Sequence, residues 1–280
     1  MNVKTMLWQA ITPIHTGVGQ TSASVIDLPV MRETATGYPV IPATSIKGVL
    51  RNGREGLEAY GFAGKETEEL DEQGRKKKIS RAAELSFTDA KLLCLPARSY
   101  KGTYALLTCP LILERFVRDQ KAFGLTPAFS SVHVTDETSA LVTGQTLVHP
   151  SQKVILEDID LTAIQSNEAS TIGSSITAQL FTESIEQAVF TQRFAIVHND
   201  VFAFFSQTAM EVTARIALET DTKTVKDGGL WYEEAIPSEA IFSGFITSTT
   251  GNFSDVERRS VVQIGGKASV GRGLLRMVVR

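Results

Sequence analysis

Hydrophobic and polar positions along the chain follow the two-residue period of strands in some segments and the 3.6-residue period of helices in others. This pattern predicts a mixed succession of strands and helices. Apolar runs rich in β-branched and aromatic residues predict strands at 3–11, 84–99, 103–109, 193–198, 240–248 and 273–279. Helical spacing and capping signals predict helices at 44–60, 110–124, 174–189, 200–209 and 255–264. This order resembles β-α-β-β-α-β with insertions, so we predict an α+β fold rather than a doubly wound parallel sheet.

Three segments interrupt this pattern. Residues 61–82 are highly charged and predict a surface loop. Residues 126–170 are irregular and β-like. Apolar and polar residues alternate in two segments that flank a turn-rich stretch, 211–218 and 230–234. This pattern predicts a projecting hairpin.

The hairpin combines cations with Trp231 and Tyr232. Such a ribbon suits wedging between nucleic-acid bases. A Trp231 side chain that packs inward is the equally open alternative.

The predicted helix at 44–60 has an apolar face and a separate basic stripe. Lys47, Arg51 and Arg54 follow i, i+4, i+7 spacing and define the stripe. Most such stripes are solvated surfaces. Here a loop punctuated by glycine and proline, residues 14–43, leads directly into the helix. We therefore hypothesise that the stripe contacts a nucleic-acid backbone.

Asp27 stands alone in this loop. Without further context, a turn-forming aspartate is the simpler interpretation. Beside RNA, a single carboxylate can instead help to hold a divalent ion or steer a 2′-hydroxyl. No Gly-x-Ser-x-Gly or His-Glu-x-x-His motif occurs in the chain, so nothing indicates a serine hydrolase or a preformed metal cage of that type.

The C-terminal segment 264–277 is the second candidate phosphate site. Its glycines permit close approach of a backbone to a phosphate, and two cations stand among them; the set is Gly265, Gly266, Lys267, Gly271, Arg272 and Gly273. The segment does not match the frame of a P-loop and leads into a strand, which excludes nucleoside-triphosphate binding of that kind. A glycine-rich turn without a ligand remains the alternative.

Composition limits the classes of protein. The 280 residues are 42% hydrophobic and 21% charged, with a net charge of −3. That balance argues against non-specific coating of nucleic acid but allows a local basic groove. With two cysteines and no long apolar run, we expect a cytoplasmic protein that does not enter a membrane.

Several motifs carry a resemblance to a known family. They are "TPIHTGVG", "IDLPVMRETATGYPVIPATSIKGVLR", "VHNDVFAFF", "GGLWYEEAIP" and "GGKASVGRG". With these the chain resembles the RAMP superfamily of CRISPR proteins, most closely the backbone (Cas-seven-type) subunits of type III-B (Cmr) effector complexes. The resemblance implies a single RAMP domain over 1–280, with an RRM-like (ferredoxin-like) palm, an inserted finger region and a thumb at 211–234.

The resemblance also implies a function. Several copies of the chain would bind a CRISPR RNA guide as a helical filament with other Cmr subunits, and would cleave single-stranded target RNA at regular intervals. Asp27 matches the loop aspartate of a Mg²⁺- or Mn²⁺-dependent endoribonuclease. His15 and Glu233 fall at accessory catalytic positions, and Lys47, Arg51 and the 265–273 loop at guide-binding positions.

One position departs from the family. Ala235 stands where some relatives have an aromatic residue, which puts a catalytic role for the hairpin base in doubt. Two alternatives to this function stay open: a non-catalytic, RNA-binding filament subunit, and a metal-independent guide-processing ribonuclease with His15 as general base.

Overall fold

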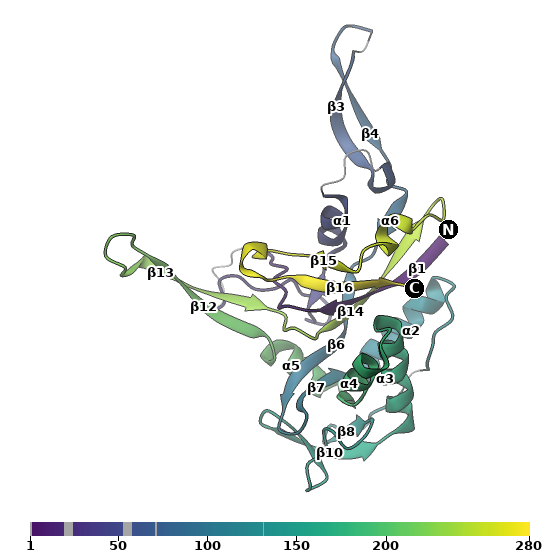
Figure 1. Cartoon of the computed structure of the whole chain (residues 1–280), viewed down its shortest axis with the longest axis vertical. Coiled ribbons are helices and arrows are strands. Elements are labelled where there is room, and N and C mark those ends of the chain that lie inside the picture. The colour runs from purple at the N-terminus through teal and green to yellow at the C-terminus, as the bar shows by residue number, and fades with distance from the viewer. Residues whose placement is uncertain (1, 20–24, 53–57, 71, 131) are drawn as a thin grey trace.

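One long sheet runs through the computed structural model of the chain, which describes residues 2–19, 25–52, 58–70, 72–130 and 132–280 (Figure 1). Its main strands are, in spatial order, β15 (Val261–Gln263), β16 (Leu274–Val279), β1 (Asn2–Ala10), β14 (Ile241–Ser248), β6 (Ala90–Ser99), β7 (Thr103–Thr108), β11 (Phe194–Val197), β8 (Ser139–Val142), β10 (Ile159–Gln165) and β9 (Lys153–Leu156). Two short strands, β2 (Val40–Ile41) and β5 (Leu85–Phe87), pair with β6 and β14.

Strand β6 joins the two halves of this sheet. Its first half pairs with β14 and its second half with β7, both antiparallel. Strand β1 lies between β14 and β16 and is buried from Thr5 onward. A strand with neighbours on both sides and buried faces reads as a continuous apolar run, as "MLW" at residues 6–8 does.

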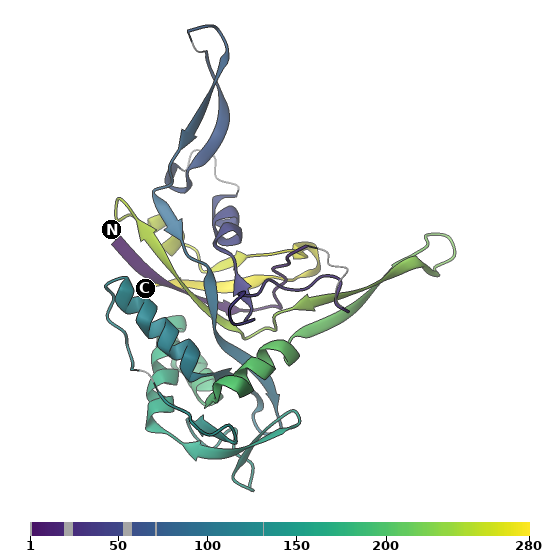
Figure 2. The ribbon, with the colours of Figure 1, turned by 180° about the vertical axis from the view of Figure 1, so that it is seen from behind.

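Helices cover the sheet, and their bounds are α1 (Ala43–Arg51), α2 (Pro110–Ala122), α3 (Asn167–Leu180), α4 (Ser184–Thr191), α5 (Asn199–Thr208) and α6 (Ser254–Glu257), with short 3₁₀ turns η1 (Glu58–Tyr60) and η2 (Ala268–Val270). Helix α3 packs against β1, β8, β11 and β16 (Figure 2). Its Gly173 permits this approach, because a Cβ there would lie 3.0 Å from a ring carbon of Phe194. None of the described helices has the length and hydropathy to cross a bilayer.

Two hairpins project from this body in different directions (Figure 1). Strands β12 (Glu211–Leu218) and β13 (Val225–Ala235) form the hairpin that alternation predicts, with Arg215 opposite Trp231. The charged insertion at 61–82 is not the loop we expected. Strands β3 (Phe62–Leu70) and β4 (Lys76–Arg81) pair there as a second antiparallel hairpin.

Other boundaries also differ from the prediction. The helix expected at 255–264 is wrong: α6 ends at Glu257, and Val261–Gln263 form the edge strand β15 because β16 offers backbone partners. The helix expected at 174–189 is two helices, α3 and α4. The region 126–170 contains β8, β9, β10 and the start of α3.

Helix α1 is shorter than expected and ends at Arg51. Its N-cap is Pro42, which offers no side-chain acceptor. The Asp89 carboxylate, between β5 and β6, accepts a hydrogen bond from the Ala43 N–H instead, at 2.8 Å. A distant acid therefore satisfies one of the free N–H groups at the start of the helix.

Helix α5 provides a test of core packing. Phe202 is fully buried and makes an edge contact with Tyr38, with ring centroids 5.3 Å apart. We expect Phe202→Ala to lower the free energy of unfolding by about 3–5 kcal/mol, measured by denaturant titration. Phe204→Ala is the matched control on the same helix, because that ring is 49% exposed, and it should cost about 1 kcal/mol or less. Equal losses would contradict this packing.

Candidate functional site

The segment that carries Asp27 runs alongside the base of strand β13. Leu28 forms an isolated parallel bridge with Glu233, and its N–H donates to the Tyr232 carbonyl at 3.1 Å. The Glu234 N–H donates to the Leu28 carbonyl at 3.0 Å. Asp27 Oδ2 accepts a hydrogen bond from the Tyr232 N–H at 2.8 Å. Two residues 205 positions apart in sequence thus meet directly, and the structure brings the predicted Asp27 to the predicted hairpin.

His15 is buried next to this contact. Its Nδ1 donates to the Glu234 carbonyl at 2.7 Å, because a carbonyl oxygen is an acceptor. Its other ring nitrogen, Nε2, faces Gly17, where a Cβ would lie 2.7 Å away. The absence of a side chain at Gly17 therefore leaves room for the imidazole.

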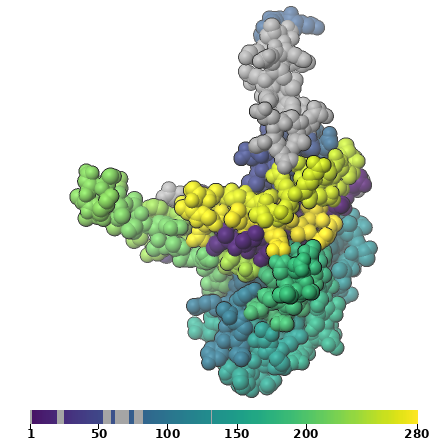
Figure 3. Space-filling model, viewed as in Figure 1, coloured from purple at the N-terminus to yellow at the C-terminus, as the bar shows by residue number. Residues whose placement is uncertain are grey.

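The glycine-rich segment packs on the same place, and Figure 3 shows the C-terminal chain beside the base of the β12–β13 hairpin. The Gly266 N–H donates to the His15 carbonyl at 2.9 Å. Gly265 has φ +89°, and a Cβ there would lie 2.4 Å from the same carbonyl oxygen. Gly273 has φ +81°, and a Cβ would lie 2.2 Å from the Ile264 carbonyl. Contacts within the protein thus account for these glycines. Gly271 ends the turn η2 with φ +77°.

Glu233 is the most strongly held acid of the cluster. Its side chain is 6% exposed and receives Lys267 Nζ at 2.7 Å, Trp231 Nε1 at 2.8 Å and Arg215 Nε at 3.3 Å. Burial raises the pKa of this carboxyl. The three donors outweigh burial and lower the pKa of Glu233 to about 2. The carboxylate is therefore ionised throughout the physiological pH range.

The cations of the glycine-rich segment have acidic partners inside the protein. Lys267 pairs with Glu233. Arg272 Nη1 lies 3.1 Å from Glu211 Oε2, and the Arg272 side chain is 15% exposed. RNA would have to compete with these carboxylates for both cations. Their contact with an RNA backbone stays a prediction.

The basic stripe lies apart from this cluster. Lys47 is half-buried and Arg51 is exposed on helix α1. Within the described part of the chain, neither forms an ion pair or joins the cluster by a hydrogen bond. Arg54 lies outside the described residues.

Sequence reasoning missed two residues of the cluster. Glu234 Oε2 accepts from the Val30 N–H at 2.9 Å, and Glu234 Oε1 lies 2.6 Å from Arg32 Nη2. Both residues are present in the quoted motifs. The alternation of side chains along a strand is the sequence signal that could have identified Glu234. Because it directs Glu233 and Glu234 to opposite faces, each acid is expected to contact a different segment.

The two faces of the hairpin differ in polarity. One face holds Arg215, Trp231 and Glu233 and meets the glycine-rich segment. The opposite face carries exposed apolar side chains, namely Val212, Ile216, Leu218, Val225, Leu230 and Tyr232. Trp231 lies on the polar face, where its indole is tied to Glu233, so Tyr232 is the aromatic residue of the apolar face.

The cluster fits a metal ion in a restricted way. Asp27 Oδ1 has no hydrogen-bond partner among the described residues, and Glu233 is already occupied by its donors. Mg²⁺ commonly binds through one or two carboxylates together with substrate phosphates and water. Asp27 thus suits a cation shared with RNA rather than one held by protein alone.

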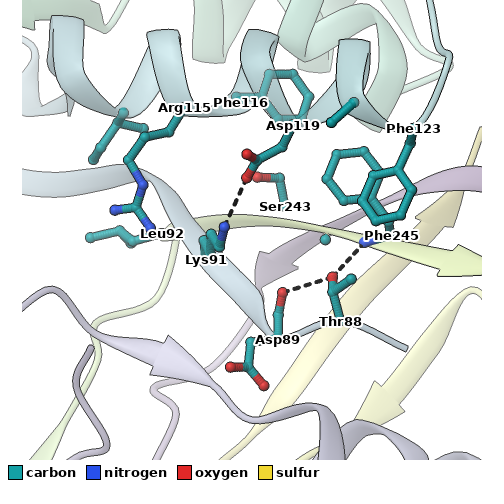
Figure 4. A pocket seen from close by; sticks show the side chains of 13 residues that line it. Thr88, Asp89, Lys91, Leu92, Arg115, Phe116, Asp119, Phe123, Ser243 and Phe245 are labelled. Atoms are coloured by element: carbon teal, nitrogen blue, oxygen red, sulfur yellow. Dashed lines mark hydrogen bonds and ion pairs between the residues drawn. The ribbon is translucent and has the colours of Figure 1, made fainter. Parts of the chain in front are cut away.

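Two other features of the surface lie apart from this cluster. Glu137, His198 and Asp200 place possible ligand atoms within 4.8 Å of one another, but His198 Nδ1 already accepts the Asp200 N–H as the cap of α5. A cavity of about 260 Å³ lies between α2 and the sheet (Figure 4). Its Lys91 pairs with Asp119 at 2.8 Å, so these opposed charges satisfy each other.

Comparisons with known proteins agree with the motifs. A family model described as the RAMP superfamily matches residues 9–276. The chain is 34% identical over 289 aligned residues to the protein named CRISPR system Cmr endoribonuclease Cmr4 of Pyrococcus furiosus, covering 96% of this chain and 93% of that relative. It is 24% identical to CRISPR system CMR subunit Cmr4 of Saccharolobus solfataricus, covering 98% and 96%.

Solved structures are similar over the whole chain. A crystal structure of oligomeric Cmr4 from Pyrococcus furiosus has a TM-score of 0.72 at 26% identity and covers 100% of this chain and 98% of that one. A chain of a type III-B Cmr-beta complex bound to cognate target RNA has a TM-score of 0.74 at 20% identity, covering 100% and 97%, and supports the fold alone. The resemblance seen in the motifs is confirmed, and this chain belongs to the RAMP superfamily.

Proposed function

We propose that the chain is the backbone subunit of a type III-B CRISPR effector complex and an endoribonuclease that cleaves target RNA. The carrying observation is the hydrogen bond that places the Asp27 carboxylate against the base of a projecting hairpin. The 34% identity to a protein named a Cmr endoribonuclease supports the same activity. In this proposal β12 and β13 are the thumb, and the central strands with their helices are the RRM-like palm.

The assembly follows from the same relatives. Several copies of the chain would line a CRISPR RNA guide with other Cmr subunits, as the existence of an oligomeric Cmr4 structure supports. Target RNA would pair with the guide and pass beside each thumb. The apolar hairpin face would then hold unstacked bases while Asp27 faces the strand. We expect the complex to work in the cytoplasm, away from membranes.

Asp27 is the residue to which we assign the reaction. Its Oδ2 is fixed by the Tyr232 N–H, which leaves Oδ1 for a ligand. A bound Mg²⁺ or Mn²⁺ would supply charge stabilisation at the phosphate, and Asp27 would hold it together with the RNA. The remaining residues orient the site: His15 ties the N-terminal segment to Glu234, and Glu233 anchors Lys267.

Replacing Asp27 tests the assignment. Asp27→Asn keeps an acceptor for the Tyr232 N–H but removes the charge, so we expect cleavage of matched RNA by the assembled complex to fall about 100-fold or more. The affinity for guide RNA should stay within about twofold, because Asp27 is not one of the residues expected to contact the guide backbone. The control is Asp227→Asn, because Asp227 is an exposed aspartate on β13. A complex with this substitution should cleave at the unaltered rate.

The outcomes separate the alternatives. Wild-type cleavage by Asp27→Asn would contradict the assignment. No cleavage by the unaltered complex in Mg²⁺ or Mn²⁺ would instead support a non-catalytic RNA-binding subunit. Cleavage of guide precursor in the presence of a chelator would support a metal-independent ribonuclease based on His15.

The basic stripe is tested by salt dependence. We expect Lys47→Gln to reduce the slope of log affinity for guide RNA against log salt by about one, because one phosphate contact is lost. Lys121→Gln on α2 is the control, since Lys121 is exposed and, like Lys47, forms no ion pair with described residues. A slope unchanged by Lys47→Gln would remove this residue from the RNA interface.

The role of Glu233 predicts a pH dependence of stability. Its pKa is about 2 in the folded chain and about 4.3 when unfolded, so its contribution is complete above about pH 4.5 and is lost as the pH falls toward 2. We expect Glu233→Gln to lower the free energy of unfolding by roughly 1–3 kcal/mol at pH 7, with a smaller difference at pH 3. A difference independent of pH would contradict the ion pairs. The control is Glu219→Gln, whose exposed side chain lies 4.0 Å from Lys226.

A further inference from the structure

The segment that carries Asp27 has little regular structure of its own. Within 25–32, backbone pairing is limited to isolated bridges at Leu28, Val30 and Arg32. Pro29 follows Leu28 and has no N–H to donate. Backbone hydrogen bonds hold Leu28 on β13 and join Met31 to Thr16 and Val40. Beyond Leu28, however, no backbone hydrogen bond between described residues joins the segment to the hairpin, so an anchor to β13 has to come from a side chain.

Glu234 supplies that anchor with its side chain. Oε2 accepts the Val30 N–H at 2.9 Å, and Oε1 lies 2.6 Å from Arg32 Nη2. The Glu234 side chain is 5% exposed and that of Arg32 is 24% exposed. A carboxylate so well shielded from water is costly unless it is paired, so loss of either partner leaves the other charge unsatisfied.

Arg32 extends the connection in two further directions. Its Nη1 donates to the Gly37 carbonyl and to the Ser206 carbonyl, both at 2.9 Å. The planar guanidinium therefore ties the Asp27 segment to its own returning loop and to helix α5 at once. An ammonium group has no such fixed fork.

The backbone of Glu234 completes the arrangement. Its N–H donates to the Leu28 carbonyl, and its carbonyl accepts from His15 Nδ1. One residue therefore connects His15 and Leu28, the neighbour of Asp27, to the hairpin base. Glu233, its neighbour, faces the opposite side and holds Lys267.

We propose that Glu234 and Arg32 are positioning residues that hold the Asp27 carboxylate at the hairpin base, without contacting RNA themselves. The proposal rests on the proposed function of Asp27. Because misplacement of a reacting group by about 1 Å can cost 100-fold in rate, their loss lowers the cleavage rate and leaves target binding intact.

The test is single-turnover cleavage of matched RNA by the assembled complex, with target affinity measured in parallel. We expect Glu234→Gln and Arg32→Ala to cleave at least about tenfold more slowly, with target affinity changed by less than about twofold. Arg32→Lys should restore part of the rate, since an ammonium reaches Glu234 but not both carbonyls. Circular dichroism and thermal unfolding check that each variant folds.

The neighbouring acid provides the matched control. Glu33 pairs with Arg115 through two hydrogen bonds of 2.6 and 2.8 Å, with a side chain 16% exposed, but it ties the loop to α2 instead of β13. A complex with Glu33→Gln should therefore cleave matched RNA at a rate within about threefold of that of the unaltered complex. An equal loss in Glu33→Gln would mean that loop integrity in general, rather than Glu234, sets the rate, and would overturn the proposal.

Hydrogen exchange in the free chain gives a readout that does not depend on cleavage. Glu234→Gln and Arg32→Ala should speed amide exchange across residues 27–32 several-fold, while Asp27→Asn should not change exchange at Val30. Unchanged exchange and an unchanged cleavage rate in both variants would overturn the positioning role. Normal cleavage by Asp27→Asn would overturn the proposed function instead, so the two failures are distinct.

Discussion

Adjacent side chains of a β-strand point to opposite faces, and this constraint organises the base of the β12–β13 hairpin. Glu233 faces the glycine-rich segment and holds Lys267, while Glu234 faces the N-terminal loop and holds Arg32. Two neighbouring acids thus fasten two segments that are far apart in sequence to one strand. The position of Asp27 depends on this arrangement, because among the described residues only Leu28 of its segment joins the hairpin through the backbone, and the Glu234 side chain supplies the next connection.

The same arrangement neutralises much of the local positive charge. Lys267 and Arg272 stand in a segment that looks ready for phosphate, yet both pair with carboxylates of the hairpin. The glycines beside them permit close contacts with His15 and Ile264 rather than leaving an open cradle. An RNA phosphate would have to bind these cations more favourably than the carboxylates that already pair with them.

Local signals predicted much of the fold. Alternation identified the β12–β13 hairpin, and Pro110 marked the first residue of α2, because both depend on neighbours in sequence. Signals failed where a distant partner decides the structure. Val261–Gln263 form a strand because β16 lies beside them, although their spacing suits a helix. Likewise, Asp27, His15 and Glu233 were identified as candidates, but their contacts through Glu234 and Arg32 require the folded pairing of β13 with the loop.

The central claim is geometric: the hairpin base presents the Asp27 carboxylate to the target strand. The most direct measurement is a structure of the assembled complex with guide and an uncleavable target RNA. We predict that a target phosphate lies within about 4 Å of Asp27 Oδ1, close enough for one cation to bridge them, with the Glu234–Arg32 pair intact. A target strand that passes the thumb with its phosphates well beyond reach of Asp27 would contradict the account.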